Sequence, residues 1–311
     1  MQALPILFSA LAVLLFLFAA GLLYCFLRIF YSFRKKEEPA DSIPKGKIYD
    51  THREQILTWI KDSRTLPRRE VSIRSHDGLL LRGYYYEYKK GAPIEILIHG
   101  YRGSGERDMS GGIFRCFSLG HSALVIDHRA SGRSEGHVIT FGDKEALDCL
   151  RWVDFTVNEI DPDARIILTG ISMGAATVMN MASMPLPKNV VGILADCGYT
   201  STREIIEKVM RDLHLPDKLL YPFARLSARI FGGFDPNNGS PIESMKRCQL
   251  PIIFIHGDED DFVPCSMSVR NHEACASEKK RLVIIPHASH ALCYPTDKET
   301  YVRALREFFE E

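Results

Sequence analysis

The sequence predicts an α/β protein with a mostly parallel central sheet, helices on both faces, a small helical cap and an N-terminal transmembrane helix. Short runs that are apolar throughout alternate with helical stretches along most of the chain, as strands do when both faces of their sheet are covered. One long interval, 199–249, interrupts this alternation. No charged residue lies between Ala3 and Leu27. These observations divide the chain into an anchor, a sheet domain and a cap.

The composition is typical of a globular protein with a full core. The chain has 311 residues, 46% of them hydrophobic, and a formal net charge of zero. This balance gives no electrostatic reason to expect a nucleic-acid partner. The eight cysteines form no CxxC pair, so neither a zinc site nor a disulfide framework is indicated. We expect no metal or cofactor, and the sequence leaves the oligomeric state open.

The N-terminal segment is long and apolar enough to cross a bilayer. At about 1.5 Å per residue, the stretch from Ala3 to Leu27 spans a hydrocarbon core of roughly 30 Å as one helix. The alternative is a cleaved signal peptide, but the segment has no basic start and no small-x-small cleavage site follows it. We therefore predict a transmembrane anchor over residues 1–32, followed by a polar linker over 33–47.

The charges around the anchor predict its orientation. Arg28, Arg34, Lys35 and Lys36 follow the span, and no Lys or Arg precedes it. Positive residues are favoured on the cytoplasmic side of a membrane. The sequence therefore predicts a single-pass membrane protein whose C-terminal domain faces the cytoplasm.

Residues 48–311 form the predicted α/β domain. A helix is expected over 48–60, followed by two antiparallel strands joined by a turn that contains Asp77 and Gly78. The apolar runs that predict the remaining strands are 94–100, 122–128, 164–170, 190–196, 250–257 and 280–287. Helices are expected near 143–157, 172–183, 266–277 and 296–310. The interval 199–249 is expected to form a helical cap above the C-terminal edge of the sheet, where such sheets bind ligands.

Ser172 is the candidate nucleophile. It lies in the sequence Gly170-Ile171-Ser172-Met173-Gly174, between an apolar strand and a helix. In that context G-x-S-x-G predicts a strained turn that presents the serine, with glycines that let strand and helix pass closely. The alternative is an ordinary serine N-cap of the helix.

A second loop offers groups that can stabilise a developing oxyanion. The sequence His99-Gly100-Tyr101-Arg102-Gly103 follows an earlier apolar strand. Two backbone N–H groups fixed in advance can bind the negative oxygen of a tetrahedral intermediate. We expect these donors to be the amides of Tyr101 and Met173, and we expect His99 to be structural.

A serine nucleophile needs a base, and the loop after the last strand offers two histidines. His290 lies between the small residues Ser289 and Ala291, where its ring can turn toward the nucleophile, and it is the favoured base. His287 follows the strand almost directly, so it is expected to cap the strand or to line the pocket.

The chain resembles the α/β-hydrolases over nearly everything after the anchor. The elements that carry the resemblance are HGYRGS, DHRASGRSEG, GISMGAA, HGDEDDFVP and ASHA. More narrowly, the chain is similar to the membrane-anchored, single-domain serine hydrolases that include protein depalmitoylases, lysophospholipid lipases and uncharacterised bacterial members. Their acid loop, H-G-x-x-D-x-x-V-P, implies that Asp260 is the acid that hydrogen-bonds His290. Asp196, at the end of another apolar strand, is the alternative acid.

Two further loops were assigned structural roles. Asp127 and Arg129 are expected to pair and hold their loop, in which Ala130 stands where the family usually has glycine. A calcium site in the acidic run 258–261 is not favoured, because Phe262, Val263 and Pro264 follow it directly and supply no oxygen-bearing side chain.

The combined prediction is a serine hydrolase that cleaves carboxylic esters or thioesters through an acyl-enzyme, with Ser172, His290 and Asp260 as its triad. The expected substrate is a small-molecule or lipid-like acyl ester, and no cofactor is needed. One alternative is a serine peptidase of the same fold. The alternative from another class is a non-catalytic interaction module held at the membrane.

Overall fold

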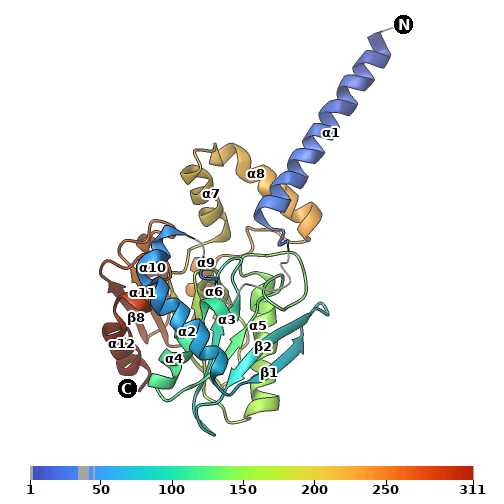
Figure 1. Cartoon of the computed structure of the whole chain (residues 1–311). Coiled ribbons are helices and arrows are strands. Elements are labelled where there is room, and N and C mark those ends of the chain that lie inside the picture. The colour runs from blue at the N-terminus through green and yellow to red at the C-terminus, as the bar shows by residue number, and fades with distance from the viewer. Residues whose placement is uncertain (1–2, 34–41, 45, 311) are drawn as a thin grey trace.

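The computed structural model describes residues 3–33, 42–44 and 46–310, and its centre is an eight-stranded sheet (Figure 1). Along the sheet the strands are β1 (Arg69–Arg74), β2 (Leu80–Tyr86), β4 (Ser122–Ile126), β3 (Ile94–Ile98), β5 (Ile166–Ile171), β6 (Val190–Asp196), β7 (Ile252–Gly257) and β8 (Lys280–Ile285). Strand β2 is antiparallel to both of its neighbours, and the other pairings are parallel. The predicted mostly parallel sheet is confirmed.

The register brings the C-terminal ends of the central strands to one edge of the sheet. Ile98 at the end of β3 lies opposite Gly170 on β5, and Ile171 lies opposite Asp196 at the end of β6. Asp196 in turn lies opposite Ile255 on β7. The loops that follow these four strands therefore start side by side. They carry the candidate site together with the loop after β8, whose Ile285 lies opposite Gly257 of β7.

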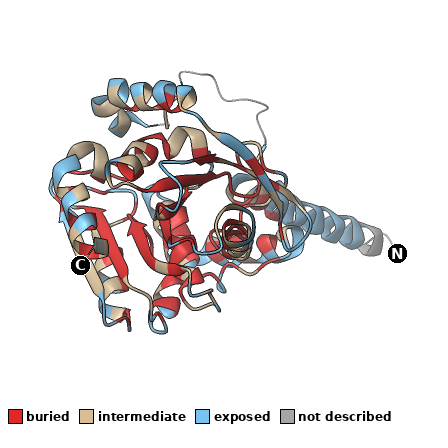
Figure 2. Ribbon diagram, turned by 90° about the horizontal axis from the view of Figure 1, so that it is seen from below, coloured by how far each residue is buried: buried red, intermediate tan, exposed pale blue. Residues whose placement is uncertain are grey.

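Helices cover both faces of the sheet, as alternate residues of β3 show. Ile96 and Ile98 join the core cluster that contains Trp152 of α5, whereas Leu97 joins the cluster that contains Ile113 of α4. The helices of the domain are η1 (Lys47–His52), α2 (Arg53–Thr65), α3 (Gly105–Asp108), α4 (Ser110–Ser118), α5 (Lys144–Phe155), η2 (Thr156–Ile160), α6 (Met173–Met181), α10 (Cys265–Ala274), α11 (Cys293–Thr296) and α12 (Lys298–Glu310). In Figure 2 the buried residues concentrate in the strands and in the helix faces turned toward them. Helices α3 and α4 were not predicted.

The interval between β6 and β7 contains the helices of the expected cap. They are α7 (Thr202–Asp212), α8 (Asp217–Ser227), η3 (Ala228–Gly232) and α9 (Pro241–Met245). Helices α7 and α8 form an angled pair that projects from the sheet domain on the same side as the N-terminal helix (Figure 1).

The N-terminal helix α1 (Ala3–Ile29) has a free part and a docked part. Its stretch Ile6–Ile29 is long and apolar enough to cross a membrane, by length and composition. Leu22, Phe26 and Phe30 follow at steps of four residues and are buried against the domain. The predicted linker, 33–47, falls largely on 34–41 and 45, which lie outside the described residues.

Candidate functional site

Ser172 occupies a strained turn between β5 and α6. Its φ of 57° and ψ of −114° lie where residues with a side chain are rarely found. A Cβ atom on Gly170 would overlap the carbonyl of Gly174, and one on Gly174 would overlap the carbonyl of Ile98. Both flanking glycines are therefore required by the close approach of backbones, as G-x-S-x-G predicts.

Ser172, His290 and Asp260 come together in one hydrogen-bonded chain. His290 Nε2 lies 2.9 Å from Ser172 Oγ, and His290 Nδ1 lies 2.7 Å from Asp260 Oδ2. All three residues are buried, and Ser172 keeps 7% of its surface exposed. In the tautomer that satisfies both bonds, Nδ1–H donates to the carboxylate and Nε2 accepts from the serine hydroxyl.

The carboxylate of Asp260 is held in its charged form. The amides of Phe262 and Val263 donate to Oδ1 at 3.0 and 2.8 Å, and His256 Nε2 lies 3.1 Å from Oδ2. Burial by itself raises the pKa of Asp260, but the hydrogen bonds from His256 and His290 outweigh it and hold that pKa at about 2. The group facing His290 is thus an anion at neutral pH.

His256 is a member of the site to which the sequence analysis assigned no role. It is fully buried at the end of β7. Its Nε2–H is shared between Asp260 and the carbonyl of Val263, 2.8 Å away, and its Nδ1 accepts from Ser268 Oγ at 2.6 Å. The sequence feature that could have indicated this role is its position four residues before Asp260, at the start of the H-G-x-x-D loop.

The neighbouring acids of the loop have other partners. Asp258 accepts a hydrogen bond from the amide of His287 at 2.6 Å, and Glu259 lies 2.8 Å from the His287 ring. His287 itself is exposed and does not reach Ser172; its pairing with Glu259 raises its pKa. Asp261 is exposed, and its carbonyl accepts from Lys208.

Asp196, the alternative acid, is bonded elsewhere. Its Oδ2 accepts a hydrogen bond from the hydroxyl of Tyr301 at 2.8 Å. Burial raises the pKa of Asp196, which favours its neutral form, although the Tyr301 bond acts in the opposite direction. Of the two acids, Asp260 is the one hydrogen-bonded to His290.

The loop expected to carry an oxyanion donor passes directly over the serine. A Cβ atom added to Gly100 would lie 3.4 Å from Ser172 Cβ. Met173 is the first residue of α6, and the first amides of a helix have no acceptor within it. His99 Nδ1 lies 2.7 Å from the carbonyl of Gly100, and its Nε2 accepts from the amide of His128 at 3.0 Å. The His99 ring thus braces this loop, in keeping with its expected structural role.

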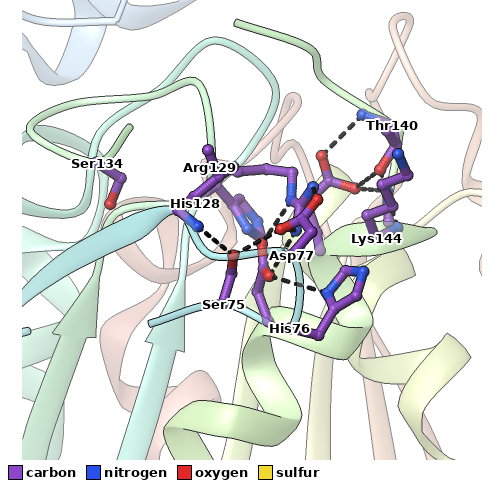
Figure 3. A network of polar contacts seen from close by, with 12 residues as sticks. Ser75, His76, Asp77, His128, Arg129, Ser134, Thr140 and Lys144 are labelled. Carbon is purple, nitrogen blue, oxygen red and sulfur yellow. Dashed lines mark hydrogen bonds and ion pairs between the residues drawn. The ribbon is translucent and has the colours of Figure 1, made fainter. Parts of the chain in front are cut away.

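The expected pairing of Asp127 with Arg129 is wrong. Asp127 accepts from the amides of Gly105 at 2.8 Å and Arg133 at 3.0 Å. Arg129 is buried, and its guanidinium bonds two other carboxylates, of which Figure 3 labels Asp77. It donates to Asp148 at 2.6 and 2.7 Å, and to Asp77, in the turn between β1 and β2, at 2.9 and 3.1 Å.

Strand β4 ends at Ile126, so Asp127 and Arg129 lie in the loop after it and not on one face of a strand. Ala130 has a φ of 60°. That conformation explains why glycine is usual there.

Among the described residues, two groups of side chains have ligand atoms close enough to hold a metal ion. One is Cys197, Asp260 and His290, whose ligand atoms lie within 4.8 Å of one another. The other is His76, Asp77 and Asp148, where the guanidinium of Arg129 already supplies positive charge. In the first group Asp260 and His290 are hydrogen-bonded to each other. This favours a serine–histidine–aspartate triad over a resident metal ion.

A cleft of about 1550 Å³ opens above Ser172. His290, Tyr101 and Phe262 line it near the serine. It extends to Trp59 of α2 in one direction and also includes Asp212, the last residue of α7. The cleft is large enough for a drug-sized or lipid-like molecule.

Comparisons with known proteins agree with this architecture. A family model described as the alpha/beta hydrolase fold matches residues 96–239. The uncharacterized protein YqkD of Bacillus subtilis is 29% identical over 193 residues, which cover 62% of this chain and 63% of that protein, a little under two thirds of its length. The mitochondrial palmitoyl-protein thioesterase ABHD10 of Pongo abelii is 23% identical over 244 residues, which cover 73% of this chain and 76% of that protein.

A solved structure, that of the Pyrococcus furiosus esterase Pf2001, matches with a TM-score of 0.67 and 22% identity, and covers 89% of this chain and 98% of that one. The chain has the α/β-hydrolase fold, and the family model together with its similarity to an esterase and a thioesterase supports its membership of the α/β-hydrolase superfamily. The resemblance and the fold class expected from the sequence are confirmed.

Proposed function

We propose that the protein is a serine hydrolase that cleaves carboxylic esters or thioesters. The observation that carries this proposal is the hydrogen-bonded chain from Ser172 through His290 to Asp260, with distances of 2.9 and 2.7 Å. A serine at this type of turn is an activated nucleophile only when a base accepts its proton and a carboxylate orients that base. The hydrogen bonds of His290 to Ser172 and to Asp260 support both conditions.

Each step follows from the positions of these groups. His290 Nε2 takes the proton of Ser172 Oγ as that oxygen attacks the acyl carbon, and Asp260 stabilises the resulting imidazolium. The amides of Tyr101 and Met173 bind the oxyanion of the tetrahedral intermediate. When the intermediate collapses, His290 returns the proton to the leaving alcohol or thiol. Water then releases the acyl group from Ser172 by the same sequence, so no cofactor is required.

The protein is also proposed to be anchored in a membrane by α1, with the hydrolase domain on the cytoplasmic side. Apart from Ser9, the exposed side chains of α1 between Ile6 and Phe18 are apolar, and a helix of this kind has no partner for them in water. The basic residues that follow the span favour the cytoplasmic placement.

The proposed activity is tested by supplying full-length protein in detergent micelles with three acyl donors of one chain length. These are p-nitrophenyl esters, acyl thioesters and aminoacyl p-nitroanilides. We expect ester and thioester hydrolysis that falls by at least about a thousandfold in Ser172→Ala. Ser289→Ala is the matched control, since Ser289 lines the same cleft.

Two results would contradict the proposal. Cleavage of the anilides in preference to the esters would favour the serine peptidase, and the absence of Ser172-dependent turnover of any donor would favour the non-catalytic module.

A further inference from the structure

We propose that α8, together with the α7–α8 turn and η3, is a second membrane-contacting surface that lies in the bilayer beside α1, and that an acyl ester resident in the lipid reaches Ser172 from this surface. The inference about the substrate rests on the proposed hydrolase function, and the inference about the surface rests on the proposed anchoring by α1.

Helix α8 is packed along α1 and not only against the hydrolase domain (Figure 1). The ring of Phe223 on α8 meets Phe18 of α1 edge-on, with centroids 5.7 Å apart. Phe231 on η3 meets Phe26 of α1 with centroids 5.6 Å apart. The cap therefore follows the anchor for about two turns of helix toward its N-terminus.

The contact at Phe18 lies within any membrane that α1 crosses. Helix α1 has 27 residues, Ala3–Ile29, and crossing a hydrocarbon core of about 30 Å takes about 20 of them. If the hydrocarbon begins at Ala3, it ends near Leu22, and Phe18 is inside it. If the hydrocarbon begins later, or if the helix tilts, Phe18 lies deeper. Phe223 must then lie at the level of the acyl chains.

The outer face of α8 has the residues that such a position requires. Leu219 and Leu226 of α8 and Ile230 of the adjoining η3 recur at helical spacing and are 64%, 37% and 56% exposed. Tyr221 and Ala224, on the opposite face, are buried in the core cluster that also contains Phe26 of α1. An amphipathic helix with an exposed apolar face is the usual structure for lying in a membrane interface.

The segments on either side extend the same surface. Leu213 and Leu215 are exposed in the turn between α7 and α8, and Phe231 is exposed on η3. Lys218 and Arg229 are exposed close to these apolar residues, where their positive charges can form ion pairs with lipid phosphates. The alternative occupant of this face is a second copy of the chain. The bilayer is favoured because the face is continuous with the side of a membrane-spanning helix.

The surface also adjoins the cleft that contains Ser172. Asp212 lines that cleft and is followed directly by Leu213 of the apolar turn. On the same helix α7, Lys208 donates to the carbonyl of Asp261 and lies 5.9 Å from the ring of Phe262, which also lines the cleft. An acyl chain leaving the bilayer at the α7–α8 turn therefore enters the cleft beside the acid loop.

The surface is tested with tryptophan substitutions in the full-length protein in phosphatidylcholine vesicles, with and without brominated acyl chains that quench nearby tryptophan. Leu219→Trp and Leu226→Trp report the proposed surface, and Phe16→Trp reports the anchor. Tyr88→Trp is the negative control, because Tyr88 is exposed and follows β2 at the edge of the sheet opposite the loops of the candidate site. The emission of the native Trp59 and Trp152 is subtracted using the wild-type protein.

We expect brominated lipid to quench positions 16, 219 and 226 several-fold more than position 88, and aqueous iodide to show the reverse order. If the tryptophans at positions 219 and 226 are quenched no more than the one at position 88, while the one at position 16 is quenched, the proposed surface is refuted and the anchor is retained. If 16 is not quenched, the anchor is refuted and the surface with it. Protection of 219 and 226 from both quenchers, dependent on protein concentration, would assign the face to a second copy.

The route of the substrate is tested by placing a negative charge on the proposed surface and measuring the hydrolysis of an ester held in vesicles. Leu226→Glu is expected to lower the hydrolysis of a vesicle-borne acyl ester several-fold relative to Tyr88→Glu, and an equal rate would overturn the route. Labelling of Ser172 by a soluble fluorophosphonate is measured on each variant. If Leu226→Glu hydrolyses the vesicle-borne ester more slowly but is still labelled at Ser172, the route is supported. If the wild-type protein is not labelled at Ser172, the hydrolase proposal is refuted instead.

Discussion

At the residue scale, the acidic run 258–261 separates into one enclosed carboxylate and three that face outward or brace the loop. Asp260 has both oxygens occupied by donors, and one of those donors is His290. Asp258 and Glu259 instead tie the loop to His287. The four neighbouring acidic residues thus have different surroundings, because β7 ends at Gly257 and the turn that follows buries only one of their side chains.

Asp260→Asn is expected to lower kcat/KM for an ester by about 10³- to 10⁴-fold, because the amide no longer stabilises the imidazolium or fixes the tautomer of His290. Asp258→Asn and Asp261→Asn are the matched controls. They are expected to change kcat/KM by no more than about threefold, since outward-facing substitutions shift free energies by about 0.5 kcal/mol. A greater loss in Asp261→Asn than in Asp260→Asn would show that a different acid orients the base.

The low pKa of Asp260 also makes a prediction about stability. Its pKa is about 2 in the folded protein and about 3.8 when unperturbed, so its ionised form favours folding. This contribution, about 2 kcal/mol, is complete above pH 4 and is lost as the pH falls toward 2. Denaturant unfolding of the wild type and of Asp260→Asn from pH 6 to pH 2 measures it. The difference between them should shrink with acidification, and a constant difference would contradict the assignment.

At the element scale, the end of α1 and the loop that passes over Ser172 are joined by hydrogen bonds. The Tyr101 hydroxyl donates to the carbonyl of Ile29 at 2.6 Å. Arg102 Nη2 donates to the carbonyls of Arg28 at 2.9 Å and Tyr31 at 3.0 Å. These donors satisfy carbonyls that a helix end leaves unpaired. Burial raises the pKa of Tyr101 to about 12, so its hydroxyl keeps the proton that it donates.

Tyr101→Phe is therefore expected to affect turnover as well as stability. Tyr199→Phe is its matched control, because the Tyr199 hydroxyl also donates to a carbonyl, that of Phe141, at 2.9 Å. Each variant should lose about 1 kcal/mol of unfolding free energy. Only Tyr101→Phe should lower kcat, by about fivefold, since only its loop carries a proposed oxyanion donor. Equal values of kcat in the two variants would contradict this coupling.

Most strands and the long helices could be predicted from local patterns, because each has an apolar run of the right period. Helix α4 could not, since it begins with Ser110-Gly111-Gly112 and glycine disfavours helices. It forms because Ile113 and Cys116 become buried against the sheet, and α2 packs over it. That stabilisation comes from residues distant in the sequence.

The docking of the anchor was not predictable for a related reason. Phe26 and Phe30 contact the domain, whereas Phe8 and Phe16 are exposed, yet all are phenylalanines of the same N-terminal segment. Residue type alone does not distinguish a lipid-facing side chain from one that packs on protein. The partners of Asp127 and Arg129 were missed likewise, because Arg129 reaches Asp77, 52 residues away.

At the scale of the whole molecule, the anchor, the cap and the loops of the candidate site lie on one side of the sheet, and the C-terminal helix α12 lies away from them (Figure 1). With α1 in a membrane, this arrangement turns the candidate site toward the lipid. The opposite edge of the sheet then faces water.

The proposed orientation is tested by protease access in intact cells that express the full chain. Because Arg28 and the basic residues after it favour the cytoplasmic side, external protease should leave the hydrolase domain intact until the membrane is permeabilised. Digestion of the domain in intact cells would reverse the orientation and leave the chemistry of the site unaffected.

The central claim is that Ser172 is a nucleophile activated by His290 and Asp260, and covalent labelling of the folded protein by a fluorophosphonate tests it most directly. Peptide mass spectrometry should place the phosphonyl group on Ser172. Labelling should be lost in Ser172→Ala, slowed in Asp260→Asn and retained in Ser289→Ala. A folded wild-type protein that remains unlabelled, or that carries the label on another residue, would contradict the claim.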